Sequence, residues 1–126
     1  MTSTTEHRGI EPEHMRNLAL SAAKAGKRVL VVPLTQDAGA ALFESLDPAE
    51  LDDVTHVVRT RGREGVRFTN GGALRIVSAF SARGGARGQS ADVVLVDGGA
   101  LPDERLEREL APIVTAGGAL VVAPLG

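Results

Sequence analysis

The chain of 126 residues contains no cysteine. This absence excludes disulfide bonds, thiolate catalysis and metal sites built from thiolates. Two of the three histidines, His7 and His14, lie near the N-terminus and the third is His56, a distribution that does not favour a zinc site. No apolar run approaches the roughly 20 residues that span a membrane, and the polar residues 1–8 do not resemble a signal peptide. We therefore expect a cytoplasmic protein without a membrane partner.

Aromatic residues are almost absent, because the chain has no tryptophan or tyrosine and only three phenylalanines, Phe43, Phe68 and Phe80. The core must be built from valine, leucine, isoleucine and alanine, and a surface that stacks nucleic-acid bases on aromatic rings is not expected. The hydrophobic fraction of 43% and the charged fraction of 24% are typical of a globular domain. We expect a flexible tail over residues 1–10 and one domain over residues 11–126.

Positive charge is concentrated in the middle of the chain. Residues 1–58 carry nine acids and five bases, and residues 92–126 carry six acids and two bases, whereas residues 59–91 carry seven arginines and one acid. Arginine forks pair bidentately with phosphates, so this central block could face a polyanion. Alternatively, it neutralises the acidic flanks or solvates a surface. The seven arginines are Arg59, Arg61, Arg63, Arg67, Arg75, Arg83 and Arg87.

Short apolar runs indicate the strands. The continuous run over residues 93–96 predicts a strand buried on both faces, as in parallel sheets covered by helices. A similar strand is expected over residues 29–32, a weaker strand over residues 55–59 and a last apolar strand over residues 119–123. Two further β-rich runs flank Asn70-Gly71, which predicts a β-hairpin because both of these residues tolerate positive φ.

Three helices are expected around these strands. The first has Pro12 in its first turn and stops at Gly26. The second is capped by Thr35 or Asp37, and the third covers residues 103–110. Helices that alternate with four or five strands indicate an α/β fold.

The glycine motifs do not form a phosphate-binding loop. A P-loop needs Gly-x-x-x-x-Gly-Lys-Ser/Thr between a strand and a helix, whereas Gly26-Lys27 precedes a strand and is followed by Arg28. We interpret Lys27 and Arg28 as positive charges that stabilise the negative C-terminal end of the first helix. The glycines within the Arg/Gly/Ser loop expected over residues 80–90 also precede a strand. They predict a mobile connection, which either presents Arg83 and Arg87 to a polyanion or only links two elements.

Three polar residues are expected at the carboxyl ends of core strands, the edge where open α/β sheets bind ligands. Asp97 ends the run over residues 93–96 and could hold Mg²⁺ through water, although capping of the following turn is the interpretation that we favour. Thr35 and Gln36 follow the strand over residues 29–32 and could touch a nucleic-acid backbone or cap the next helix.

The order of segments over about residues 17–124 resembles the ATPase domain of phage terminase large subunits and related helicases. The strand that reaches Pro33-Leu34-Thr35 and then enters an alanine-rich helix is similar to the segment just after the P-loop in that family. The Asn-Gly hairpin, the Arg-Gly segment that leads into the Walker B strand, and the helix and strand beyond it follow in the family's order. The segments that carry the resemblance are residues 18–46, 68–79, 86–97, 110–112 and 118–124.

The resemblance implies a three-layer α/β fold with a mostly parallel sheet of P-loop NTPase type and an inserted β-hairpin. The chain keeps the family's Asp97, Arg83 and Arg87, but the P-loop is absent and Gly98 stands where the Walker B glutamate would activate water. We also expect that no nuclease domain follows. Because phosphoryl transfer depends on positioning and charge stabilisation, loss of both groups implies a relative that does not hydrolyse ATP.

We therefore expect a catalytically inactive, phage-encoded protein that needs no cofactor and binds DNA or a phage or host protein in the bacterial cytoplasm. Self-association would be a further mode of binding, since a sheet edge without the missing P-loop strand favours pairing. The sequence also leaves open a residual binder of Mg-ATP that uses Asp97, and a methyltransferase-like domain, which residues 92–99 and the following elements resemble. The candidate nucleic-acid ligands are Arg59, Arg61, Arg63, Arg67, Arg83, Arg87, Thr35 and Gln36.

Overall fold

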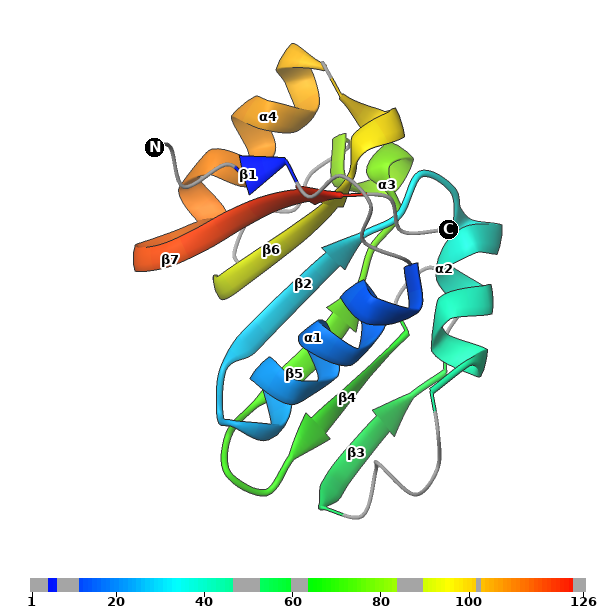
Figure 1. Cartoon of the computed structure of the whole chain (residues 1–126), viewed down its shortest axis with the longest axis vertical. Helices are drawn as coiled ribbons and strands as arrows, with labels where there is room; N and C mark the ends of the chain where they lie inside the picture. The colour runs from blue at the N-terminus through cyan, green and yellow to red at the C-terminus, as the bar shows by residue number, and fades with distance from the viewer. Residues whose placement is uncertain are drawn as a thin grey trace.

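Seven strands pair into one sheet in the computed structural model, which describes residues 5–6, 12–46, 53–59, 64–83, 90–101 and 103–123 (Figure 1). The order across the sheet is β1-β7-β6-β2-β5-β4-β3. The strands are β1 (Thr5–Glu6), β2 (Arg28–Val32), β3 (Val54–Val58), β4 (Gly65–Phe68), β5 (Ala73–Ile76), β6 (Ala91–Asp97) and β7 (Val114–Ala123).

The sheet is mixed but mostly parallel. β1, β7, β6, β2 and β5 are parallel neighbours, and β4 and β3 extend the sheet beyond β5 with antiparallel pairing. This arrangement confirms the predicted α/β class and the hairpin around Asn70-Gly71. The assignment to the terminase type of P-loop NTPase stays a prediction.

Helices cover both faces of the sheet and give three layers. α1 (Pro12–Lys24) and α2 (Gln36–Glu44) lie on one face, and α3 (Ala79–Arg83) and α4 (Glu104–Leu110) lie on the other (Figure 1). Two short 3-10 helices, η2 (Gly98–Ala100) and η3 (Ala111–Ile113), flank α4. Within the described ranges, no helix is long and apolar enough to cross a membrane.

β2 is buried on both faces, as its continuous apolar sequence predicts. Val29 and Val31 pack with α1 and α2, whereas Leu30 and Val32 pack with α3 and α4. β6 is covered in the same way, since Leu95 joins the first of these cores and its neighbours on either side join the second. The alternation along the two central strands therefore holds the three layers together.

The turn between β4 and β5 is fixed against the end of α1. Gly71 has a φ of +91°, and the side chain of Asn70 accepts a hydrogen bond from the Gly72 N–H at 3.0 Å. The same side chain donates to the Lys24 carbonyl at 2.6 Å. Gly72 lies so close to α1 that a Cβ there would overlap the carbonyl oxygen of Ala23. Close approach, rather than backbone freedom alone, requires glycine at position 72.

Three sequence-based expectations differ from the structure. The predicted loop over residues 80–90 begins as the helix α3, because Ser78 is buried and its Oγ accepts the N–H of Ser81, which caps a short turn. The last strand starts at Val114 rather than at residue 119, since Val114 pairs with Ala91 at the start of β6. Thr5–Glu6, which lie in the predicted tail, pair with β7 as the strand β1.

The close packing at Gly72 can be tested with Gly72→Ala. We expect the substitution to lower the free energy of unfolding by about 2 kcal/mol or more, because the new methyl group forces α1 and the hairpin apart. Urea denaturation measures the change. Gly98→Ala is the matched control, since its Cβ would only touch a Val122 methyl group at 3.6 Å. Equal unfolding midpoints for the two variants would contradict this close approach of the hairpin to α1.

Candidate nucleic-acid interface

On the side that carries α3 and α4, the described helices cover only one half of the sheet, and the other half is called the open half below. The buried core under these helices is built from β2, β6 and the helices themselves, and it includes no described residue of β3, β4 or β5. A groove of about 380 Å³ lies on this open half, beside the first residues of β2, β5 and β6. Its lining residues are Arg28, Val29, Leu30, Thr55, His56, Arg67, Phe68, Thr69, Gly71, Gly72, Ala73, Arg75, Ser90, Ala91 and Ile113.

Strand register explains why basic side chains meet there. His56 pairs with Arg67, Arg67 pairs with Ala73, and Ala73 pairs with Arg28, so these four residues form one row across β3, β4, β5 and β2. Paired residues point to the same face of a sheet. Arg75 is two residues beyond Ala73 on β5 and therefore shares this face.

The three arginines surround a small area. Neighbouring strands lie about 4.8 Å apart and residues two apart on a strand about 6.6 Å, so the backbone positions of Arg28, Arg67 and Arg75 form a triangle with sides of roughly 8 to 10 Å. Arginine side chains are long enough to converge on one ligand from these positions. Among the described residues that line the groove there is no acid.

Arg67 and Arg75 are available for a ligand. Both side chains are exposed, and neither guanidinium has a hydrogen-bond or ion-pair partner within the described part of the chain. The apolar neighbours of these arginines explain their orientation. Val66 and Phe68 flank Arg67, Leu74 and Ile76 flank Arg75, and all four are buried under α1 and α2. The alternation leaves the arginines on the opposite, open face.

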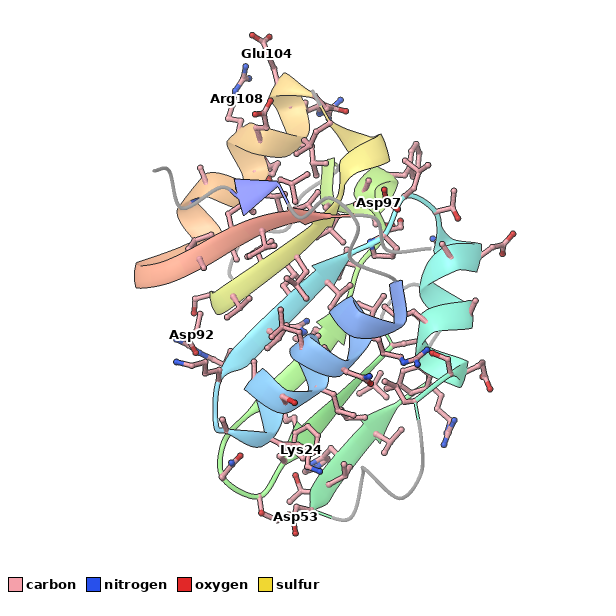
Figure 2. All side chains as sticks on the ribbon, in the orientation of Figure 1. Lys24, Asp53, Asp92, Asp97, Glu104 and Arg108 are labelled. Atoms are coloured by element: carbon pink, nitrogen blue, oxygen red, sulfur yellow. The ribbon has the colours of Figure 1, made fainter. Side chains whose placement is uncertain are left out.

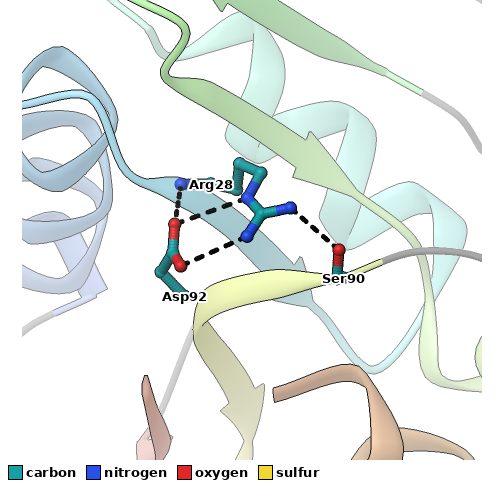
Figure 3. Close-up of polar contacts among 3 residues, drawn as sticks. All are labelled: Arg28, Ser90 and Asp92. Carbon is teal, nitrogen blue, oxygen red and sulfur yellow. Dashed lines mark hydrogen bonds and ion pairs between the residues drawn. The ribbon is translucent and has the colours of Figure 1, made fainter. Parts of the chain in front are cut away.

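Arg28 is held in place by Asp92 of β6 and by Ser90, which directly precedes that strand (Figure 3). Its Nε and Nη2 lie 3.5 and 3.4 Å from the two carboxylate oxygens of Asp92, and its backbone N–H donates to the same carboxylate at 2.9 Å. On the other side, its Nη1 donates to the Ser90 hydroxyl at 2.8 Å. Arg28 and Ser90 line the groove, whereas Asp92 is not among the lining residues.

The structure brings together only part of the arginine block that the sequence indicates. Arg67 and Arg75 share the groove, but the guanidinium of Arg59 lies 5.7 Å from the centre of the Phe43 ring, on the side covered by α2. Arg59 therefore does not belong to this surface.

Arg83 is the last residue of α3, and only its backbone is described. Arg61, Arg63 and Arg87 lie outside the described residues.

Thr35, Gln36 and Asp97 are at the opposite, carboxyl edge of the parallel strands. Figure 2 shows Asp97 and Asp92 at the two ends of β6. Thr35 caps α2 by accepting the Ala38 N–H at 3.1 Å, and Gln36 is the first residue of that helix. The capping interpretation of Thr35 is thus confirmed, and neither residue contributes to the groove.

Asp97 also acts as a cap. Its Oδ1 accepts the N–H of Gly99 at 2.8 Å at the start of η2. Among the described residues, no three His, Asp or Glu side chains lie close enough together to hold a metal ion. The capping interpretation that the sequence favours is therefore confirmed for Asp97, and a metal-binding role stays a prediction.

Sequence reasoning missed Arg28 and His56 as groove residues, and it counted Arg75 in the basic block without naming it among the candidate nucleic-acid ligands. The sequence pattern places Arg28 at the end of the first helix, but it is the first residue of β2 and pairs with Ala73 of β5. The available signal was alternation, because Arg28 precedes buried Val29 as Arg67 precedes buried Phe68. His56 was identifiable only from its pairing with Arg67, which depends on a register shift in β3.

The two roles of Asp97 make different predictions. If capping is its function, Asp97→Asn keeps the free energy of unfolding and Asp97→Ala lowers it by about 1 kcal/mol, because asparagine caps as well as aspartate does. Urea denaturation with and without Mg²⁺ measures both effects. A Mg²⁺-dependent stabilisation that Asp97→Asn abolishes would show instead that the carboxylate binds the metal.

Comparison with known proteins does not assign the site. No protein-family model, curated protein or solved structure matches the chain. The basis for a functional conclusion is therefore the groove itself, with its three arginines on one open sheet face.

Proposed function

We propose that this protein binds DNA through the groove on the open sheet face, with Arg67 and Arg75 as ligands of backbone phosphates. The observation that carries the proposal is that these two exposed guanidinium groups share a groove without an acidic lining residue and have no partner within the described residues. Guanidinium groups bind phosphates through paired, charge-assisted hydrogen bonds. A polyanion fits such a surface better than an apolar partner does.

The groove favours contact with the backbone rather than with the bases. Phe68 is the one phenylalanine among its described lining residues, and its side chain is buried under α1 and α2 on the other face. Among the described lining residues, only the His56 imidazole could therefore offer a ring for base stacking. The polar lining groups besides the arginines are Thr55, His56, Thr69 and Ser90, which suit phosphate and sugar oxygens. We expect binding with little sequence preference.

We propose further that this protein is a terminase-like protein that has lost ATP hydrolysis. The mostly parallel three-layer α/β fold is consistent with this relationship. Gly98 follows Asp97 at the end of β6, where a hydrolytic member would carry its glutamate. In this proposal the fold serves binding, and its cellular setting is a bacterial host infected by a phage.

A residual nucleotide site near Asp97 is the second candidate. β2 and β6 are neighbours, and the chain leaves β2 toward α2 on one face and β6 toward α4 on the other. Such a switch point in an open α/β sheet is where ligands bind. The Mg²⁺ dependence of Asp97 variants tests this candidate, whereas a protein partner or self-association would be detected by light scattering without DNA.

The DNA-binding proposal predicts that Arg67→Gln and Arg75→Gln each weaken binding roughly tenfold, since each removes a charge-assisted phosphate contact. Fluorescence anisotropy with a short labelled duplex, from about 50 to 200 mM salt, measures the affinity. The slope of log affinity against log salt should fall by about 0.9 for each lost phosphate contact.

Arg108→Gln is the matched control, because Arg108 is an exposed arginine on α4 and does not line the groove (Figure 2). It changes the net charge by the same amount and should leave the affinity nearly unchanged. Equal losses of affinity in all three single variants would assign the binding to overall charge. Undiminished binding by the double variant, which combines Arg67→Gln with Arg75→Gln, would refute the proposed site.

A further inference from the structure

Arg28 is a third cation in the groove, and it differs from the other two in being paired with an acid. We infer that a DNA phosphate displaces Asp92 from the Arg28 side chain, so that Arg28 becomes a third phosphate ligand and Asp92 acts as an internal competitor of the bound anion. This inference rests on the proposed DNA binding. It assigns Asp92 the role of limiting affinity, although Asp92 is not a lining residue of the groove.

The ion pair is built in a way that makes exchange easy. The Arg28 and Asp92 side chains are 47% and 31% exposed, and the two contacts between guanidinium and carboxylate are 3.4 and 3.5 Å long. Exposed ion pairs with long contacts contribute little to stability, because water competes for both partners. A phosphate that offers two oxygens to the same guanidinium forms a stronger, bidentate contact.

Both partners keep other contacts when the pair opens. The Asp92 carboxylate still accepts the backbone N–H of Arg28 at 2.9 Å, which does not depend on the arginine side chain. The Nη1 of Arg28 still donates to the Ser90 hydroxyl at 2.8 Å, and Ser90 lines the groove. The guanidinium therefore stays at the groove wall while its remaining N–H groups change from carboxylate to phosphate.

The position of Arg28 completes the phosphate site. Arg28 pairs with Ala73, and Leu30 pairs with Arg75, so Arg28 and Arg75 are diagonal neighbours on adjacent strands. Arg67 approaches from the other side of Ala73. A phosphate above Ala73, whose side chain is a single methyl group, is within reach of all three guanidinium groups. The described lining residues include no acid, so Asp92 competes with the phosphate through its ion pair with Arg28 rather than from the groove wall.

A double-mutant cycle tests this inference with the same labelled duplex. Asp92→Asn keeps an oxygen that can accept the Arg28 N–H but removes the charge that competes for the guanidinium. We expect Asp92→Asn to raise the affinity roughly three- to tenfold and Arg28→Gln to lower it about tenfold. In the Arg28→Gln background, Asp92→Asn should have no effect, because the competitor acts through Arg28.

Asp53→Asn is the control for simple electrostatics. Asp53 lies two residues before Thr55 of the groove, and its carbonyl accepts the Thr69 N–H, so the substitution removes one negative charge near the groove without touching Arg28. We expect a much smaller gain than for Asp92→Asn. Unchanged urea midpoints establish that the variants are folded.

The outcomes separate the two proposals. If the wild-type protein binds and loses affinity in Arg67→Gln and Arg75→Gln, the proposed function stands. The competitor role is then overturned by a gain from Asp92→Asn that persists in the Arg28→Gln background, by an equal gain from Asp53→Asn, or by no gain at all. If neither the wild-type protein nor Asp92→Asn binds the duplex, both proposals fail together.

Discussion

The parallel pairing of β2 with β5 on one side and β6 on the other is the constraint on which the rest of this structure depends. β2 is buried on both faces, so its register fixes the helix layers above and below it. Its first residue, Arg28, lies in the groove and contacts Ser90 and Asp92 beside the start of β6. Its last residue is Val32, and from there the chain continues to Thr35, which caps α2. Both candidate sites, at opposite edges of the sheet, are thus positioned by a five-residue strand.

Unequal covering by the described helices makes the two faces of the sheet different. α1 and α2 cover one face from β2 to β4, and Val66, Phe68, Leu74 and Ile76 are buried beneath them. On the other face, the described part of the second core includes no residue of β4 or β5, and Arg67 and Arg75 are exposed. The same strands therefore serve as core on one side and as a charged surface on the other, because their sequence alternates.

Much of the fold could be predicted from the sequence, because its signals are local. The runs that form β2 and β6 and the Asn70-Gly71 turn each specify their element through neighbouring residues. α3 was missed because five residues give too short a periodic pattern, and its start depends on the buried hydroxyl of Ser78. The extra length of β7 was missed because its start depends on the pairing of Val114 with Ala91 of β6, ahead of a register shift that precedes Ala119.

The candidate site was predictable only in part. Counting charges identifies Arg67 and Arg75, but no count separates them from Arg59, which tertiary packing places over Phe43. Strand register decides which charges share a surface, and register depends on pairing between distant segments. Arg28 is 39 residues before Arg67 in the chain, yet both flank Ala73 across the sheet. The distribution of charge along the chain shows the excess of arginine but not which arginine side chains share a surface.

The fixed turn at Gly72 has a consequence for how this surface can evolve. In a strand, a shift by one residue exchanges the two faces. An inserted or deleted residue between β4 and β5 that moved β4 along β5 would send Arg67 inward and bring Val66 and Phe68 to the open face. The contacts of Asn70 and Gly72 with the end of α1 oppose that slip. The length of one hairpin loop therefore determines which residues of β4 lie on the open face. We expect natural variants to differ at the arginine positions more often than in the length of this loop.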